Sequence, residues 1–225
     1  MRPFNNILLI LIGLSQLAFA QQKDSVDAKA FIPTGIRAGW DLVSPARAEL
    51  SNTFKGFEAS VDIDLYRYYP TIEIGNAGRN YLSENGSSYE NDGNYWRVGI
   101  DVNFMKKDPE KNMFFLGARY ARSSYSEEAR IVTTDPLWGD YDQVLQNNNL
   151  TASWMELTTG MRIKVWKILW LGYTARFKFA KNLDDNVNLL TTDVPGYGAT
   201  DRPNTWGFSY YVMVKLPVRK VKTGI

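Results

Sequence analysis

Three carboxylates lie close together in the stretch from Gly56 to Tyr66, which reads GFEASVDIDLY. Glu58, Asp62 and Asp64 share one parity of this stretch. Paired carboxylates can act as a general acid and a general base, so a hydrolase that uses them is conceivable. Basic side chains of other segments are predicted to face the same way. Ion pairing is therefore favoured over catalysis, because buried charges must be compensated.

The chain has no histidine and no cysteine. Without histidine the usual base for an activated serine is missing, and metal sites built on histidine or cysteine are excluded. Asp184 and Asp185 could bind Ca²⁺ weakly, although a solvated acidic loop is the more common explanation of such a pair. The formal net charge of +2 indicates no nucleic-acid partner. We predict that the protein is not an enzyme and has no cofactor.

The element that carries these carboxylates is predicted to be a β-strand with two opposed faces. Between Phe57 and Leu65, apolar residues occupy every second position, and acidic or polar residues occupy the positions between them. Strict alternation of this kind is typical of a strand. The same pattern recurs along the chain. The predicted strands are residues 35–43, 56–66, a segment that begins with 71–75, 94–104, a segment that starts near 113, 154–165, 169–179 and 206–216.

The connections between these strands alternate in length. Long connections are expected at 44–55, 76–93, 123–149 and 181–204, and short turns between the other strands. Pro45 is interpreted as a breaker, and the many Asn, Gly and Ser residues of 76–93 as loop chemistry; residues 127–133 could extend their strand as a hairpin. Short turns on one side and long loops on the other are typical of outer-membrane barrels. The predicted fold class is all-β, an eight-stranded antiparallel up-and-down transmembrane β-barrel.

Glycine placement indicates which face of the strands points inward. Gly99, Gly117 and Gly160 are among the glycines on the polar parity. Glycine weakens a strand, but the interior of an eight-stranded barrel is only just wide enough for side chains. The polar face is therefore predicted to fill the lumen, whereas a soluble barrel of lipocalin type would bury the apolar face. The predicted lumen charge network consists of Arg37, Asp41, Glu58, Asp62, Asp64, Glu73, Arg97, Asp101, Arg119, Glu156, Arg162, Arg176 and Lys178.

Aromatic residues concentrate at the ends of the predicted strands, where a membrane barrel carries its two interfacial girdles. The girdle near the long connections is predicted to contain Trp40, Phe57, Trp96, Tyr120 and Trp206, and the girdle near the short turns Tyr66, Phe104 and Trp166. Inward-facing aromatic and sulfur-containing side chains near the short turns are expected to close the lumen. They are Phe115, Trp170, Tyr211 and Met213.

The N-terminal segment is predicted to be removed from the mature protein. An apolar run over 7–20 ends in Ala18-Phe19-Ala20, which is typical of a secretory signal peptide and is too short for a spanning helix. We therefore expect a signal peptide over 1–20, a flexible leader over 21–34, the barrel over 35–217 and a basic periplasmic tail over 218–225. The leader contains Asp24-Ser25-Val26, which resembles an O-glycosylation motif of exported bacterial proteins.

The strand pattern as a whole resembles the small eight-stranded outer-membrane barrels, with the architecture of OmpX and of the OmpA transmembrane domain. It is also similar to uncharacterised outer-membrane β-barrel families of Bacteroidetes. The resemblance covers the mature chain and implies a location in the bacterial outer membrane, but it implies no active-site residue. One departure is the C-terminus, which is a basic tail after Leu216 and not an aromatic residue.

The expected role is that of a non-enzymatic barrel that acts through its loops or its lipid-facing wall. Such a role can be structural, can consist of binding, or can be that of a subunit of an outer-membrane complex. The expected partners are outer-membrane lipid, lipopolysaccharide and other outer-membrane or periplasmic proteins. The alternative is a narrow pore or small-solute transporter through the charged lumen.

Overall fold

The computed structural model of the chain describes residues 31–105, 108–135, 139–180, 189 and 191–218. The chain divides into two units, Met1–Ile32 and Pro33–Ile225, and the second contains every helix and strand described below. The predicted signal peptide and most of the predicted leader and basic tail lie outside the described residues, as do Asp184 and Asp185.

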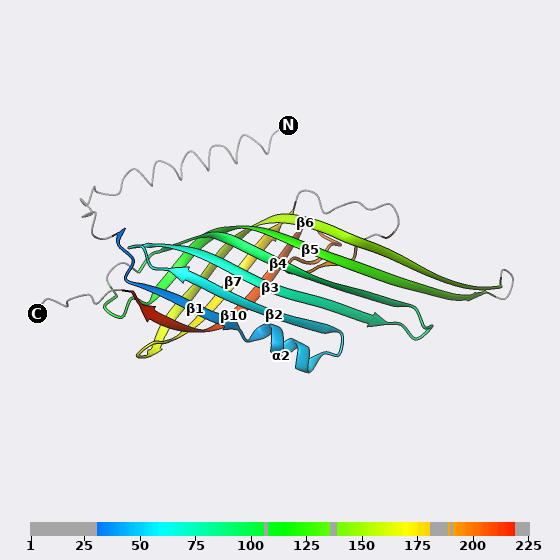
Figure 1. Cartoon of the computed structure of the whole chain (residues 1–225), viewed down its shortest axis with the longest axis horizontal. Helices are drawn as coiled ribbons and strands as arrows, with labels where there is room; N and C mark the ends of the chain where they lie inside the picture. The colour runs from blue at the N-terminus through cyan, green and yellow to red at the C-terminus, as the bar shows by residue number, and fades with distance from the viewer. Residues whose placement is uncertain (1–30, 106–107, 136–138, 181–188, 190, 219–225) are drawn as a thin grey trace, which may run out of the picture. The chain divides into compact units, whose positions relative to one another are not determined.

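Eight antiparallel strands close into a barrel in the order β1-β10-β7-β6-β5-β4-β3-β2, so that neighbours in the ring follow one another along the chain (Figure 1). The ring closes between the first and last strands, where Ile36 pairs with Leu216 and Trp40 with Val212. This confirms the predicted eight-stranded up-and-down barrel. The strands are β1 (Gly35–Asp41), β2 (Phe54–Ile63), β3 (Tyr68–Leu82), β4 (Ser88–Asn103), β5 (Met113–Asp135), β6 (Gly139–Trp166), β7 (Leu169–Phe179) and β10 (Asn204–Pro217).

The prediction of a loop over 76–93 is wrong. β3 and β4 continue through this segment as a ladder that ends with Leu82 opposite Ser88. Tyr81 and Tyr89 pair across the ladder with their rings 6.5 Å apart, and cross-strand aromatic pairs of this kind stabilise a sheet. Only the turn at Gly86, whose φ is 86°, requires the left-handed conformation that glycine adopts easily. Composition therefore misled the prediction, because cross-strand pairing outweighed low intrinsic strand preference.

The first long connection contains a helix that the sequence analysis did not predict. Helix α2 (Val43–Leu50) follows β1 directly, and Pro45 lies in its first turn. The interpretation of Pro45 as a breaker is wrong. Proline is tolerated in the first turn of a helix, because backbone N–H groups there have no intrahelical acceptor and the missing N–H of proline costs no hydrogen bond. The Asp41 carboxylate accepts hydrogen bonds from the backbone N–H and the hydroxyl of Ser44, which satisfies one free donor at the start of the helix.

The third long connection is an extension of its strands, as the sequence analysis suggested for 127–133. β5 and β6 pair from Met113 opposite Arg162 to Asp135 opposite Gly139, with a register shift after Tyr125. In Figure 1 this ribbon runs far beyond the ends of the other strands. The end of the barrel that carries this ribbon, α2 and the turn between β3 and β4 is called the long-loop end, and the opposite end the short-turn end.

Two smaller differences concern the second strand and the last long connection. β2 ends at Ile63 and not at Tyr66, because Tyr66 has a φ of 63° and lies in the tight turn to β3. Between β7 and β10, the short strands β8 (Asp193–Val194) and β9 (Gly198–Ala199) form a hairpin of their own. Residues 191–200, which contain this hairpin, are called the plug segment below. No helix in the described part of the chain is long and apolar enough to cross a membrane.

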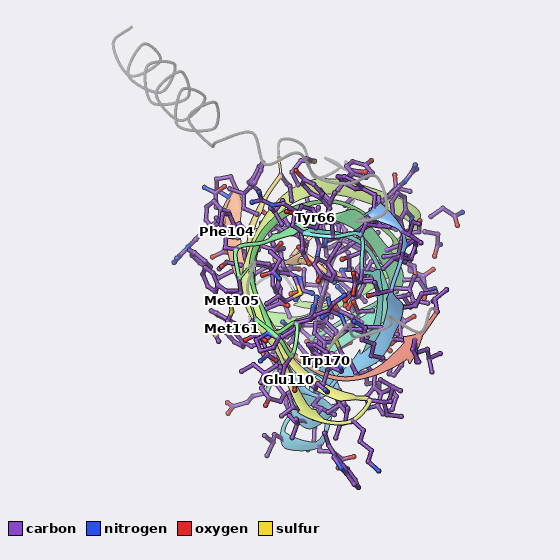
Figure 2. All side chains as sticks on the ribbon, turned by 90° about the vertical axis from the view of Figure 1, so that its left-hand side faces the viewer. Tyr66, Phe104, Met105, Glu110, Met161 and Trp170 are labelled. Atoms are coloured by element: carbon purple, nitrogen blue, oxygen red, sulfur yellow. The ribbon has the colours of Figure 1, made fainter. Side chains whose placement is uncertain are left out.

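The interior of the barrel is polar and full. Figure 2 looks into the short-turn end and shows side chains across the whole ring of strands. A side chain at Gly117 would collide with the Asp101 carboxylate, and one at Gly160 would meet the ring of Phe115. The inward glycines therefore make room for the larger inward side chains of neighbouring strands, as a narrow barrel requires.

Candidate functional site

The upper cluster of the lumen consists of two arginines and three glutamates that five different strands contribute. Arg97 Nη1 lies 2.6 Å from Glu58 Oε2 and 3.3 Å from Glu73 Oε2, and its Nε lies 2.9 Å from Glu156 Oε1. Arg176 faces the same three carboxylates, at 3.1 Å from Glu58, 2.9 Å from Glu73 and 3.4 Å from Glu156. All five side chains are buried. Each carboxylate is therefore shared by both guanidinium groups, which is the compensation that buried charge needs.

The lower cluster lies on the side of the short-turn end and consists of three arginines and two aspartates. Arg37 Nε donates to Asp62 Oδ1 at 2.8 Å, and Arg119 Nη2 donates to Asp101 Oδ2 at 2.8 Å. Arg162 lies between these pairs, 3.5 Å from Asp62 and 3.7 Å from Asp101. All five side chains are almost fully buried. The lumen thus brings together ten members of the predicted network, five arginines and five carboxylates, in two clusters that are connected because Arg119 also faces Glu73 of the upper cluster at 3.7 Å.

Three members of the predicted network are buried but belong to neither cluster. The carboxylate of Asp41 accepts hydrogen bonds from Ser44 and from the Tyr210 backbone N–H, and takes part in no ion pair among the described residues. Asp64 lies at the short-turn end, where Lys215 Nζ is 2.9 Å away. Lys178 Nζ donates to the carbonyl oxygens of Gly196 at 2.7 Å and Tyr197 at 3.0 Å. Alternation along a strand shows that a side chain points inward, but it does not show which group that side chain meets.

Aromatic and sulfur-containing side chains lie beneath the lower cluster. Phe115, Trp170, Tyr211 and Met213, which are predicted to close the lumen, are all buried. Arg37 lies over the Trp170 ring at 5.1 Å, within the range of a cation–π contact. The hydroxyl of Tyr211 reaches upward and donates to the Glu58 carboxylate. Tyr211 therefore joins the floor to the upper cluster.

The plug segment covers the lumen at the long-loop end. Arg97 Nη2 and Lys178 Nζ both donate to the Gly196 carbonyl oxygen, at 3.0 and 2.7 Å. The Tyr197 ring packs edge-on against Trp154 at 5.5 Å. Gly196 has a φ of 83°, and a side chain there would collide with the Tyr95 ring. The sequence predicts only a long loop here, because nothing in the local pattern of this segment indicates contact with inward side chains of other strands.

A polar cavity of about 310 Å³ lies beside the plug segment. Its cationic lining comprises Arg47 of α2, Arg79 of β3, and Lys178 of β7, together with Arg97 and Arg176 of the upper cluster. Arg79 continues the inward parity of Glu73, so this residue could have been found by extending the alternation into 76–93. For Arg47 the sequence carries no such signal, since the position of α2 depends on the closed barrel.

Asp193 of the plug segment supplies a carboxylate to this cavity. Its Oδ2 lies 3.0 Å from Arg79 Nε. Burial raises the pKa of the Asp193 carboxyl above its ordinary value, and Arg79 acts in the opposite direction. The desolvation of this carboxyl therefore outweighs the attraction of its arginine partner.

The aromatic side chains that are predicted to form the two girdles are exposed on the outer wall of the barrel. Trp96 and Tyr120 pair with ring centroids 5.7 Å apart near the long-loop end. The side chains expected in that girdle, Trp40, Phe57, Trp96, Tyr120 and Trp206, are exposed, as are Tyr66, Phe104 and Trp166 of the other. Figure 2 shows Tyr66 and Phe104 at the rim of the short-turn end.

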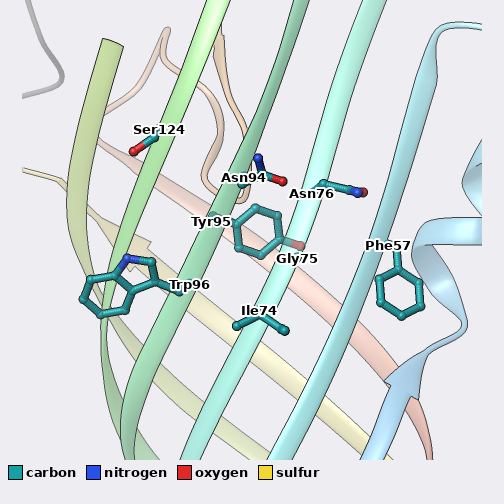
Figure 3. Close-up of a pocket in the computed structure, with 8 residues that line it drawn as sticks. All are labelled: Phe57, Ile74, Gly75, Asn76, Asn94, Tyr95, Trp96 and Ser124. Atoms are coloured by element: carbon teal, nitrogen blue, oxygen red, sulfur yellow. The ribbon is translucent and has the colours of Figure 1, made fainter. Parts of the chain in front are cut away.

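A groove of about 400 Å³ crosses the outer wall near the long-loop end (Figure 3). Phe57 and Trp96 flank it, and Ile74 lies between them. Amide and hydroxyl side chains line the part nearer the long-loop end; they are Asn76, Asn94 and Ser124. The groove therefore spans a change from an apolar to a polar outer surface.

The chemistry that this arrangement supports is charge compensation and binding. In the described part of the chain, no group of three or more aspartate or glutamate side chains is arranged to hold a metal ion. The carboxylates that could conceivably have formed an acid–base pair contact different arginines: Glu58 contacts Arg97 and Arg176, and Asp62 contacts Arg37.

Comparison with known proteins places the chain in a family. No curated protein matches it. Among solved structures, the crystal structure of neisserial surface protein A (NspA) matches with a TM-score of 0.39 and 13% sequence identity, over 82% of this chain and 96% of that chain. The predicted similarity to families of Bacteroidetes stays a prediction. A family model described as "Domain of unknown function (DUF6048)" matches residues 1–221, and the chain therefore belongs to this family.

Proposed function

We propose that the protein is an integral outer-membrane barrel with a filled lumen that acts as a non-enzymatic binding or structural protein at the cell surface. One observation carries this proposal, namely that the barrel is apolar outside and charged inside. Arg37, Arg119, Arg162 and Arg176 are among the largest fully buried side chains. Ile72, Ile74 and Phe208, in contrast, are each more than half exposed on the outer wall. A continuous apolar wall is unfavourable in water and favourable in lipid.

The two aromatic girdles support this proposal, because they match the interfaces that such a barrel would occupy. Near the long-loop end, the groove in Figure 3 changes from Ile74, Phe57 and Trp96 to Asn76 and Asn94. We infer that this change marks the outer edge of the hydrocarbon layer. Outer-membrane lipid would contact the wall below it, and lipopolysaccharide would contact the polar surface above it.

The binding role is assigned to the long-loop end, where the described residues form an extended sheet beyond the wall. β3 to β6 continue there as paired strands, with the ladder between β5 and β6 reaching Asp135 and Gly139. A paired ladder holds its side chains in fixed positions, unlike an irregular loop, and so suits a binding surface. The alternative of a narrow pore has less support, because the buried side chains of the two charge clusters and of the aromatic floor occupy the lumen, and the plug segment contacts Arg97 and Lys178.

Surface labelling of single-cysteine variants tests the location and the orientation together. The chain has no cysteine of its own, so each label reports one site. Asp140→Cys lies on the exposed β5–β6 ribbon, and Lys167→Cys lies in the turn between β6 and β7. A membrane-impermeant maleimide is expected to label Asp140→Cys on intact cells, and Lys167→Cys only after the outer membrane is opened. Equal labelling of both on intact cells, or recovery in the soluble fraction, would refute the proposal.

A second measurement addresses the export signal. If residues 1–20 form a signal peptide, the mass of the protein purified from membranes will correspond to a chain that begins at Gln21. A full-length mass would contradict cleavage without affecting the proposed location of the barrel.

A further inference from the structure

The cavity beside the plug segment holds more positive than negative side chains. Its lining includes five cationic side chains but only the carboxylates of Glu58 and Asp193. Glu58 is shared by Arg97 and Arg176 of the upper cluster. Asp193 pairs with Arg79. The upper cluster, with two arginines and three glutamates, holds no excess of positive charge. The positive excess belongs to the outer part of the cavity, where Arg47, Arg79 and Lys178 face the single carboxylate of Asp193.

Two cations of that outer part have no carboxylate partner within the described ranges of the chain. Neither Arg47 nor Lys178 takes part in an ion pair among the described residues. Lys178 Nζ donates to the carbonyls of Gly196 and Tyr197, which leaves one of its three protons for another acceptor. Arg47 is exposed, so the cavity is accessible from outside the barrel.

Two guanidinium groups also share one aromatic ring. Arg47 Cζ lies 4.4 Å from the centroid of the Phe54 ring, and Arg79 Cζ lies 5.5 Å from the same centroid. Each contact is a favourable cation–π interaction, but it holds like charges near each other at the rim of a partly desolvated space. An anion between them would remove this repulsion.

We propose that this cavity binds a phosphorylated sugar, with the phosphate held by Arg47, Arg79 and Lys178. Guanidinium groups bind phosphate through paired N–H donors, and an ammonium group adds a compact charge. The volume of about 310 Å³ is at the lower end of the range for ligand sites, which suits one sugar ring with its phosphate. Hydroxyl groups also line the cavity, and they belong to Ser44, Thr205 and Ser209.

The test is calorimetric titration of the full chain, refolded in neutral detergent micelles, with inorganic phosphate, glucose 6-phosphate and glucose at constant ionic strength. Glucose 6-phosphate is expected to bind about tenfold or more tightly than glucose, because its phosphate makes charge-assisted hydrogen bonds. Arg47→Gln is expected to weaken glucose 6-phosphate binding by about tenfold. This variant removes an exposed side chain outside the lumen clusters, so the barrel is expected to fold.

Arg130→Gln is the matched control, because it makes the same charge change at an exposed site on the β5–β6 ribbon. Its affinity for glucose 6-phosphate is expected to equal that of the unaltered chain. Equal binding of glucose and glucose 6-phosphate would overturn the proposal. So would equal losses of affinity in Arg47→Gln and Arg130→Gln, since these would indicate general electrostatic attraction without a site.

The phosphorylated sugar could be soluble or could be the headgroup of a glycolipid. Competition by lipopolysaccharide micelles for bound glucose 6-phosphate would support the site and assign it to a lipid headgroup. Binding of glucose 6-phosphate without such competition would support the site and assign it to a soluble ligand. The proposed binding site requires only that the barrel is folded, and not that it lies in the outer membrane. A negative result of surface labelling would therefore not contradict the binding site, and a lack of glucose 6-phosphate binding would not contradict the membrane proposal.

Discussion

Arg176 Nη2 lies 3.1 Å from Glu58 Oε1, although 118 positions separate the two residues in the chain. β7 and β2 are not neighbours in the ring, so this pair spans the lumen. The same guanidinium lies 2.9 Å from Glu73 and donates to the hydroxyl of Tyr211 at 2.6 Å. Arg176 therefore connects β7 to β2 and β3, two strands that no backbone ladder joins to β7, and also to its ring neighbour β10.

Arg176→Met is predicted to destabilise the barrel strongly, because it leaves the carboxylates of Glu58 and Glu73 undercompensated. Removal of one partner from a buried ion pair costs about 3–5 kcal/mol. Urea unfolding of the protein refolded into lipid vesicles measures the loss. Arg130→Met is the control, since Arg130 and Asp142 form an exposed pair, and no measurable change in its midpoint is expected. Equal midpoints for the two variants would show that the lumen cluster does not support the fold.

Val98→Arg tests whether the outer wall faces lipid. Val98 is 43% exposed on the barrel wall, and Val144 is 49% exposed on the β5–β6 ribbon. An arginine on the lipid face of a membrane barrel costs about 2–4 kcal/mol at the midplane and less toward the interfaces, so Val98→Arg, between the two girdles, should unfold at lower urea in vesicles. Val144→Arg introduces the same side chain beyond the wall and should behave like the unaltered chain. In a water-soluble barrel both substitutions would be harmless, and that result would contradict the membrane proposal.

The closed plug segment is predicted to be more stable in acid. Burial raises the pKa of the Asp193 carboxyl. This carboxyl therefore holds its proton more tightly when the plug segment covers the lumen than when the segment has opened to water. The stability that protonated Asp193 adds to the closed segment is fully present below the ordinary pKa of 3.8, and it is lost as the pH rises through the raised pKa. After correction for intrinsic rates, the Tyr197 amide, which donates to the Val194 carbonyl, should exchange more slowly at about pH 4 than at about pH 7.

Asp193→Asn is the control for this pH dependence. The amide keeps the shape of the side chain but does not titrate, so the difference between the two pH values should disappear. If it persists in Asp193→Asn, another group controls the closure of the plug segment.

The filled lumen is predicted to conduct no ions. Planar-bilayer recordings of the refolded chain should show no discrete steps, because fully buried side chains such as Arg162, Glu156 and Phe115 occupy the lumen. Asp140→Cys with a bulky thiol label on the β5–β6 ribbon should leave the recordings unchanged. Reproducible steps of one size would instead favour the narrow pore.

The sequence by itself determined the strands and the direction of their side chains. Alternation is a local property with a period of two, so Glu58, Asp62 and Arg97 could be assigned to one face without knowledge of the fold. The inward glycines, such as Gly117, then indicated that this face is crowded. Both inferences need only neighbouring residues in one strand. The extension of β3 and β4 through 76–93 was missed, because its stability comes from pairing between strands and not from composition.

Only the tertiary structure decided which charges meet. Closure of the ring places Arg176 beside Glu58 and Glu73. Asp41 instead accepts hydrogen bonds from Ser44 in the first turn of α2, and Lys178 donates to carbonyl oxygens of the plug segment. The cavity with Arg47 and Arg79 also depends on closure, because it joins a helix, several strands and the plug segment. The physical reason is that these contacts depend on strand register and on distances across the lumen, which no local pattern encodes.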